Sequence, residues 1–152
     1  MSIKIIAIGK KHEAWISEGI ERYQKRLKRP FLIEWVILSH SALDGDMARQ
    51  EESGRILSRL STSDFVILLD EHGKNIDSPG LSKLLSDQFI HSHNIVMIIG
   101  GAYGVDELVR QRADFIWSLS NLVFPHQLVR LILVEQIYRA QEIADGHPYH
   151  HE

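Results

Sequence analysis

The chain has 152 residues, of which 44% are hydrophobic and 24% charged, as expected for a globular protein with one core. Its net charge of −3 does not indicate a nucleic-acid binder, and the lack of cysteine excludes disulfides and thiolate metal sites. Because no apolar run approaches the roughly 20 residues of a membrane span or forms a signal peptide, we expect one cytoplasmic domain over residues 1–152 and no membrane partner.

Short apolar runs alternate with helical patterns along the chain. The predicted strands are Ile3–Ile8, Phe31–Leu38, Phe65–Leu69, Ile95–Ile99 and Phe115–Leu119. The predicted helices between them are His12–Leu27, Asp44–Leu60, Pro79–His91 and Val105–Arg112, with N-caps at Asp44 and Ser78. Continuous apolar strands indicate burial on both faces, so we expect an α/β fold with a mostly parallel sheet of five or six strands flanked by helices.

The first predicted helix and its surroundings are basic. Residues 1–30 carry eight lysines and arginines against three glutamates. Such a surface can meet phosphate, or it can be an ordinary solvated helix face.

The final helix is apolar nearly all round. From Leu128 to Val134 six of seven residues are apolar, and the pattern continues to Ile143. A surface helix would show one apolar stripe. This helix either runs through the centre of the domain or packs its outer face on a second copy. We favour a homodimer, because a symmetric pair closes such a patch.

Three loops follow the predicted ends of three strands: Asp70–Lys74, Gly100–Gly104 and Ser118–His126. Ligands of open α/β sheets bind beyond the carboxyl ends of the strands, so these loops are expected to form one pocket. The GGxxG spacing in the second loop suits a ligand loop or a merely tight turn, and it is neither a dinucleotide nor a P-loop motif. Asp70 and Glu71 are either site carboxylates or turn residues.

Four of the nine histidines lie in the last segment: His126, His147, His150 and His151. Histidine is readily tuned for proton transfer near neutral pH, and a folded chain can bring the two groups together. The tail lacks the rigid spacing of a metal site, so we expect no metal. It either closes over a pocket or remains a disordered terminus.

Four stretches together are similar to one known family. They are LLDEHGK at 68–74, IIGGAYGVDE at 98–107, SLSNLVFPHQLVRLILVEQIYRA at 118–140 and GHPYHHE at 146–152. The chain resembles the SPOUT-class ribosomal RNA large subunit methyltransferase H family, which methylates a pseudouridine of 23S rRNA. The similarity spans essentially the whole chain, and residues 117–152 are its most specific part.

The resemblance implies a SPOUT fold whose C-terminal part forms a deep trefoil knot, and a homodimer built on the knotted region. It implies S-adenosyl-L-methionine as the cofactor. By the matching motif positions, the cofactor-binding residues are Leu69, Gly101, Ser120, Asn121, Leu122, Val123, Phe124 and Pro125.

The implied reaction is methylation of the N3 position of a pseudouridine in 23S rRNA within the 70S ribosome or large subunit, and not of DNA. The catalytic candidates are His126, Arg130, Tyr149, His150 and His151, with Glu135 as a weaker one. We expect a tail histidine or Tyr149 to remove the proton and Arg130 to hold a phosphate or carbonyl. In a dimer the tail can reach the partner's pocket. Arg139 is expected to pair with an acid.

Two other functions stay open from the residues alone. One is a non-catalytic, ribosome-associated binding module that keeps the knotted fold. The other is a flavodoxin-type nucleotide-binding protein. A serine hydrolase is disfavoured because the chain has no GxSxG motif.

Overall fold

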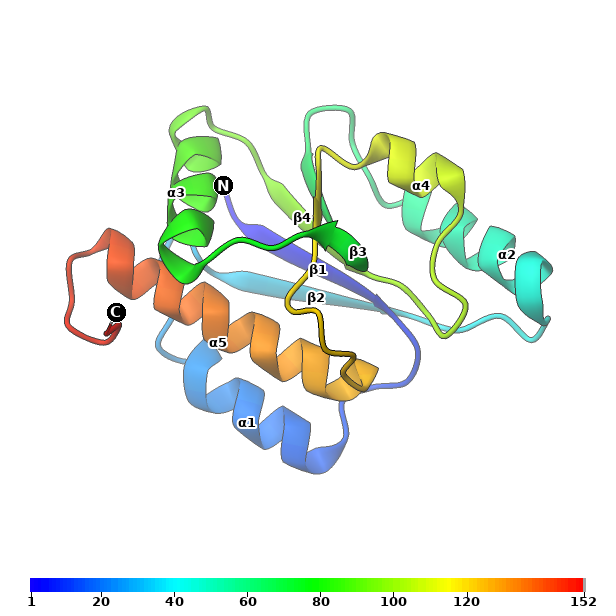
Figure 1. Ribbon diagram of the computed structural model, residues 1–152, viewed down its shortest axis with the longest axis horizontal. Coiled ribbons are helices and arrows are strands. Elements are labelled where there is room, and N and C mark those ends of the chain that lie inside the picture. Colours follow the sequence, from blue (N-terminus) through cyan, green and yellow to red (C-terminus); the bar gives the residue numbers. More distant parts are fainter. Residues whose placement is uncertain (152) are drawn as a thin grey trace.

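A five-stranded parallel sheet in the order β2-β1-β4-β3-β5 forms the centre of the molecule (Figure 1). The computed structural model describes residues 1–151. The strands are β1 (Ile3–Ile8), β2 (Ile33–Leu38), β3 (Phe65–Lys74), β4 (Ile95–Ile99) and β5 (Phe115–Trp117). The helices are α1 (Ala14–Gln24), α2 (Gly45–Leu57), α3 (Ser78–Ile90), α4 (Glu107–Arg112) and α5 (His126–Ala144). The predicted α/β class with a parallel, helix-flanked sheet is confirmed.

Helices cover both faces of the sheet. In Figure 1, α1, α3 and α5 lie on one side of the sheet and α2 and α4 on the other. Ile5 of β1 belongs to the core under the first group, and its neighbour Ile6 belongs to the core under the second. Successive side chains of a strand point to opposite faces, and here helices cover both faces. Both neighbours are therefore buried, which explains the continuous apolar strands.

The third strand is longer than predicted, and the fifth is shorter. The stretch 70–74, expected as a loop, continues β3, because Lys74 pairs with Trp117 beyond an irregularity that begins after Leu69. The Lys74 carbonyl also accepts a hydrogen bond of 2.9 Å from the Ser118 backbone N–H. Gly73 is required there, since a Cβ would lie 2.6 Å from the backbone oxygen of Ile116.

The cap of the third helix is one residue earlier than predicted. Asp77, not Ser78, is the N-cap of α3, and its Oδ1 accepts a 2.7 Å hydrogen bond from the Gly80 N–H. Asp44 does occupy the N-cap of α2, but its side chain makes no capping hydrogen bond. Pro79 stands in the first turn of α3, as predicted.

The remaining boundary differences are small. The strand expected from Phe31 begins at Ile33, and the helix expected over 12–27 is regular only over Ala14–Gln24. Such differences of a few residues are usual at helix and strand ends. They leave the loops 100–104 and 118–125 at the carboxyl edge of the sheet.

The final helix runs across one face of the sheet between α1 and α3 (Figure 1). Leu133, Val134, Ile137 and Ala140 are buried in the core on that face. A course through the middle of the domain therefore explains much of the helix's apolar character. Across residues 1–151, none of the helices has both the length and the apolarity that a membrane span requires.

Candidate active site

A cleft of about 340 Å³ lies beside the middle of β3 and the carboxyl end of β4, beneath the loop that follows β5. This volume lies within the range of ligand sites in proteins. Side chains and backbone from all three predicted loops line it, so the expectation that the loops form one pocket is confirmed. The lining residues are Leu69–Glu71, Ile99–Ala102, Gly104, Val105, Trp117–Ser120, Leu122–Phe124, His126 and Val129.

Six of the eight predicted cofactor residues line this cleft. They are Leu69, Gly101, Ser120, Leu122, Val123 and Phe124. Asn121 and Pro125 belong to the same loop but are not lining residues, and both are exposed. The cleft is therefore lined by four of the six residues of the 120–125 loop.

The glycine loop is both a tight turn and a wall of the cleft. The Gly104 N–H donates to the Gly101 carbonyl over 3.0 Å, and Gly104 has a φ of +74°, which favours glycine. A Cβ at Gly101 would lie only 2.5 Å from Oε1 of Glu52. The tight turn expected from the GGxxG spacing is confirmed, and the same segment lines the cleft, whereas its role as a ligand loop stays a prediction.

Short hydrogen bonds fix the shape of the loop after β5. The Ser118 hydroxyl donates to the Ser120 carbonyl over 2.9 Å, and the Leu122 N–H donates to the Ser120 hydroxyl over 3.0 Å. The Asn75 side-chain amide donates to the Ser118 carbonyl over 3.0 Å. The loop consequently presents Leu122 and Val123, which are 70% and 78% exposed, at the lip of the cleft.

Acidic groups dominate the charge of the cleft. Asp70 and Glu71 line it, whereas no lysine or arginine is among its lining residues in the part of the chain that the structure describes. Arg110 from α4 forms an ion pair with Asp70 and offsets that charge. A cleft with spare negative charge and no cationic side chain suits a positively charged ligand and not a phosphate.

A buried arginine lies behind the cleft. Arg130 is 2% exposed, and its Nη1 donates to the Lys10 carbonyl over 2.8 Å and lies 3.2 Å from Nδ1 of His12. Its Nε has no hydrogen-bond partner among the described residues. Burial lowers the pKa of Arg130 from its usual value. No carboxylate of residues 1–151 forms an ion pair with this guanidinium.

This guanidinium acts on two histidines. Partial burial lowers the pKa of His126, and the positive charge of Arg130 lowers it further. The same two causes, in the same order, lower the pKa of His12. Near neutral pH the imidazole of His126 at the cleft is therefore neutral and can accept a proton or a hydrogen bond.

The tail packs on the second half of α5. The Tyr149 hydroxyl donates to Oε1 of Glu135 over 3.1 Å, and Arg139 donates to the same oxygen over 2.6 Å. Nδ1 of His150 lies 3.1 Å from Nη1 of Arg139. The expectation that Arg139 pairs with an acid is confirmed. Burial and the Glu135 charge raise the pKa of Tyr149 to about 12.

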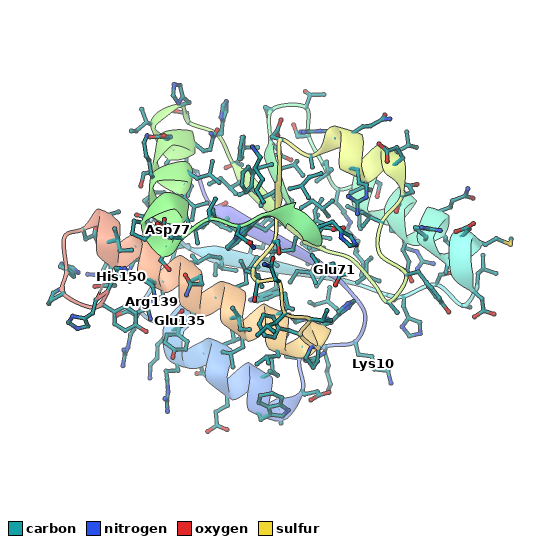
Figure 2. All side chains as sticks on the ribbon, in the orientation of Figure 1. Lys10, Glu71, Asp77, Glu135, Arg139 and His150 are labelled. Carbon is teal, nitrogen blue, oxygen red and sulfur yellow. The ribbon has the colours of Figure 1, made fainter. Side chains whose placement is uncertain are left out.

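A single chain does not bring the tail to the cleft. His126 begins α5 and the tail folds back at its other end, and a helix of 19 residues is about 28 Å long at 1.5 Å per residue. Figure 1 shows the red segment that follows α5 turning back beside the far end of that helix. In Figure 2, His150 of the tail lies toward the left of the molecule, well apart from Glu71 of the cleft near the middle. The idea that one folded chain unites these histidines is wrong for the described residues.

Sequence reasoning missed three residues around the cleft. Trp117 lines it as the last residue of β5, a position that the predicted strand end could have signalled. His12 and Glu52 come from elements that were not suspected. His12 contacts Arg130, which is 118 residues away in the sequence, and Glu52 contacts Gly101 only through tertiary packing. No local sequence pattern therefore predicts either residue.

The comparisons with known proteins agree along the whole chain. A family model described as "Predicted SPOUT methyltransferase" matches residues 1–150. Proteins named ribosomal RNA large subunit methyltransferase H from Desulfitobacterium hafniense (strain Y51), Streptococcus pyogenes (serotype M5) and Francisella philomiragia are 41%, 39% and 37% identical. Each alignment covers 99% of this chain and 99% of the relative. The chain therefore belongs to the SPOUT methyltransferase family, in the group of the large subunit methyltransferases H.

Proposed function

We propose that this protein transfers a methyl group from S-adenosylmethionine to N3 of a pseudouridine in 23S rRNA. The substrate is the 70S ribosome or the large subunit, and the place of action is the cytoplasm. Residues 1–152 act as one methyltransferase domain. Membership of the family and the names of the full-length relatives support the reaction and the RNA.

The charge of the cleft is the observation that carries the proposal. S-adenosylmethionine has a sulfonium cation and no phosphate, and its amino and carboxylate groups cancel. A cleft with Asp70 and Glu71 and no lysine or arginine among its described lining residues fits that charge. Leu122, Val123 and Phe124 provide apolar surface for the adenine. When bound, the cofactor supplies an electrophilic methyl group on sulfur.

On the acceptor side, the chain has to position the uracil ring and accept a proton from N3. Alignment of donor and acceptor supplies most of the acceleration in such displacements. His126 lies at the cleft and has a lowered pKa, so it is a neutral acceptor within the site. Arg130 is too buried to hold an RNA phosphate itself, and we assign it the task of keeping His126 neutral and holding the Lys10–His12 loop.

A homodimer completes the proposed site. The tail of one chain reaches the cleft of its partner and brings Tyr149, His150 and His151 to the acceptor. Two observations support this arrangement: each tail is docked far from its own cleft, and Leu122 and Val123 offer 70% and 78% exposed apolar side chains at the lip. A symmetric pair buries two such lips and forms two equivalent sites.

We also infer that the C-terminal part forms the deep trefoil knot of this fold class. Knots are rare exceptions among protein topologies. The inference is supported by the family match and by the convergence of the middle of β3 and the loops after β4 and β5 on one cleft.

The test is methyl transfer from cofactor labelled in its methyl group to ribosomes that lack the modification. We expect transfer to 70S particles or large subunits and little transfer to a short isolated hairpin, because a chain of net charge −3 binds free RNA phosphates weakly. Base mapping should place the methyl on N3 of one pseudouridine. Ribosome binding without any transfer would instead identify a non-catalytic binding module.

A further inference from the structure

A buried carboxylate stands directly behind the cleft wall. Glu52 of α2 is 3% exposed. Its Oε2 accepts a 2.8 Å hydrogen bond from the Ser41 N–H, whereas its Oε1 is buried and has no hydrogen-bond donor among residues 1–151. No lysine, arginine or histidine of the described chain forms an ion pair with it.

The free oxygen of this carboxylate faces the glycine loop of the cleft. A Cβ built on Gly101 would come within 2.5 Å of Oε1 of Glu52, so the carboxylate lies against Gly101, and Gly101 itself lines the cleft. The next residue, Ser53, accepts a 3.0 Å hydrogen bond from the Asp106 N–H. Helix α2 thus supports both ends of the segment 101–106, and Glu52 is fixed in place beneath it.

A buried carboxylate without a cation is costly, because the interior solvates charge poorly. Asp70, which lines the same cleft, differs from Glu52 because it has an ion-pair partner, Arg110. The missing positive charge for Glu52 can come from a ligand in the cleft. A charge interaction over several ångströms is strong where water is excluded.

We propose that Glu52 is a specificity-determining residue that favours the positively charged methyl donor over the neutral product. The proposal rests on the proposed function. The donor and S-adenosylhomocysteine differ by one methyl group and by the charge on sulfur. The Glu52 carboxylate stabilises the bound sulfonium through the Gly101 backbone, and this stabilisation disappears once the methyl has left. The product is then held less tightly, which assists its release.

The test is calorimetric titration of the full-length protein with S-adenosylmethionine, S-adenosylhomocysteine and sinefungin, whose protonated amine replaces the sulfonium. Glu52→Gln keeps the shape of the side chain and removes its charge. We expect it to weaken both cationic ligands relative to S-adenosylhomocysteine by about fivefold or more. Glu51→Gln is the matched control, because Glu51 is the neighbouring residue but is exposed and paired with Arg55. It should leave the affinity ratio unchanged, since water screens its charge.

Three outcomes would overturn the proposal. In the first, Glu52→Gln weakens the binding of all three ligands equally, which would mean that Glu52 only positions the loop. In the second, Glu52→Gln leaves all three affinities unchanged. In the third, Glu51→Gln changes the ratio of cationic-ligand affinity to S-adenosylhomocysteine affinity as much as Glu52→Gln does. If Glu52→Gln does not fold, Glu52→Met removes the charge with a side chain of similar length and serves for the same comparison. Failure of the proposed function is distinguishable, because the unmodified protein would then bind none of the three ligands.

Discussion

The hydroxyl of Tyr149 donates a hydrogen bond to Oε1 of Glu135, 3.1 Å away, and this contact joins the C-terminal tail to the middle of α5. The Tyr149 ring also packs edge-on against Tyr138, with ring centroids 4.8 Å apart. The tail is therefore fixed to its own domain at Tyr149 and His150. In a dimer it would be a rigid surface offered to the partner, so little ordering entropy would oppose its docking.

Replacing Tyr149 with Phe should lower the free energy of unfolding by about 1 kcal/mol, because Glu135 loses a hydrogen bond. The raised pKa adds a pH dependence. The pKa of Tyr149 is about 12 in the folded state, above its usual value of 10. The contribution of the protonated hydroxyl to the free energy of unfolding is therefore present below pH 10 and is lost as pH rises to 12. Urea unfolding at several pH values measures both effects.

The control for Tyr149 is Tyr103→Phe. Tyr103 is 47% exposed and its hydroxyl makes no hydrogen bond within residues 1–151. It should change stability by less than about 0.5 kcal/mol. If Tyr149→Phe and the unmodified protein lose stability in parallel from pH 10 to 12, the assignment of the raised pKa to this contact is wrong.

Replacing Arg130 with Met should raise the pKa of His126 and of His12. Both values are lowered first by burial and then by the Arg130 charge, so each should recover only partly. NMR titration of the imidazole resonances measures this directly, and His147, which pairs with Glu142, serves as the internal reference. Unchanged titration of His126 would remove Arg130 from its proposed role.

The same pair of histidines predicts how stability depends on pH. The pKa values of His126 and His12 are lowered in the folded state. Their contribution to the free energy of unfolding is therefore present above pH 6.5 and is lost as pH falls through the folded-state pKa values. Arg130→Met should therefore lose less stability than the unmodified protein between pH 7 and 5. A steeper loss in the variant would contradict the assigned cause of the pKa shifts.

Gly101→Ala should weaken cofactor binding and cost about 1–3 kcal/mol of stability, because the added methyl would meet Oε1 of Glu52 at 2.5 Å. The matched control is Gly54→Ala in α2, where a Cβ meets nothing within 4 Å. That change should stabilise the protein by about 0.5–1 kcal/mol through helix propensity. Normal cofactor affinity in Gly101→Ala would show that this loop is not part of the site.

The composite site predicts complementation between two inactive proteins. One carries Gly101→Ala in the cleft, and the other carries Tyr149→Phe, His150→Ala and His151→Ala in the tail. Mixed dimers contain one intact cleft beside one intact tail, so a re-equilibrated equal mixture should regain about a quarter of the normal methyl-transfer rate. Activity that stays at the level of the separate variants would indicate that the tail does not act across the dimer.

Sequence patterns predicted the layers of this fold well, because burial on both faces of a parallel strand leaves a continuous apolar run such as Ile95–Ile99. They also predicted the edge at which the three loops meet. They failed where pairing depends on another strand: the stretch 70–74 reads as a polar loop, yet it is held in β3 by Trp117 and Ser118.

The site was predictable only in part for a related reason. Six of the predicted cofactor residues do line the cleft, because they belong to segments near strand ends or to motifs of the family. Glu52 and His12 were not, because each reaches the site through long-range packing, with Gly101 and Arg130 respectively. The position of the tail, beside Glu135 and away from His126, likewise depends on tertiary contacts that no periodicity records.

The most direct measurement of the central claim is a backbone NMR titration of the protein with S-adenosylmethionine. We predict saturable shifts of the amides of Leu69, Gly101 and Leu122, one from each wall of the cleft, with one common affinity, while the amide of His147 stays unchanged. Saturable binding that leaves these three amides unmoved, or that moves only one of them, would contradict a single cofactor cleft formed by the three loops.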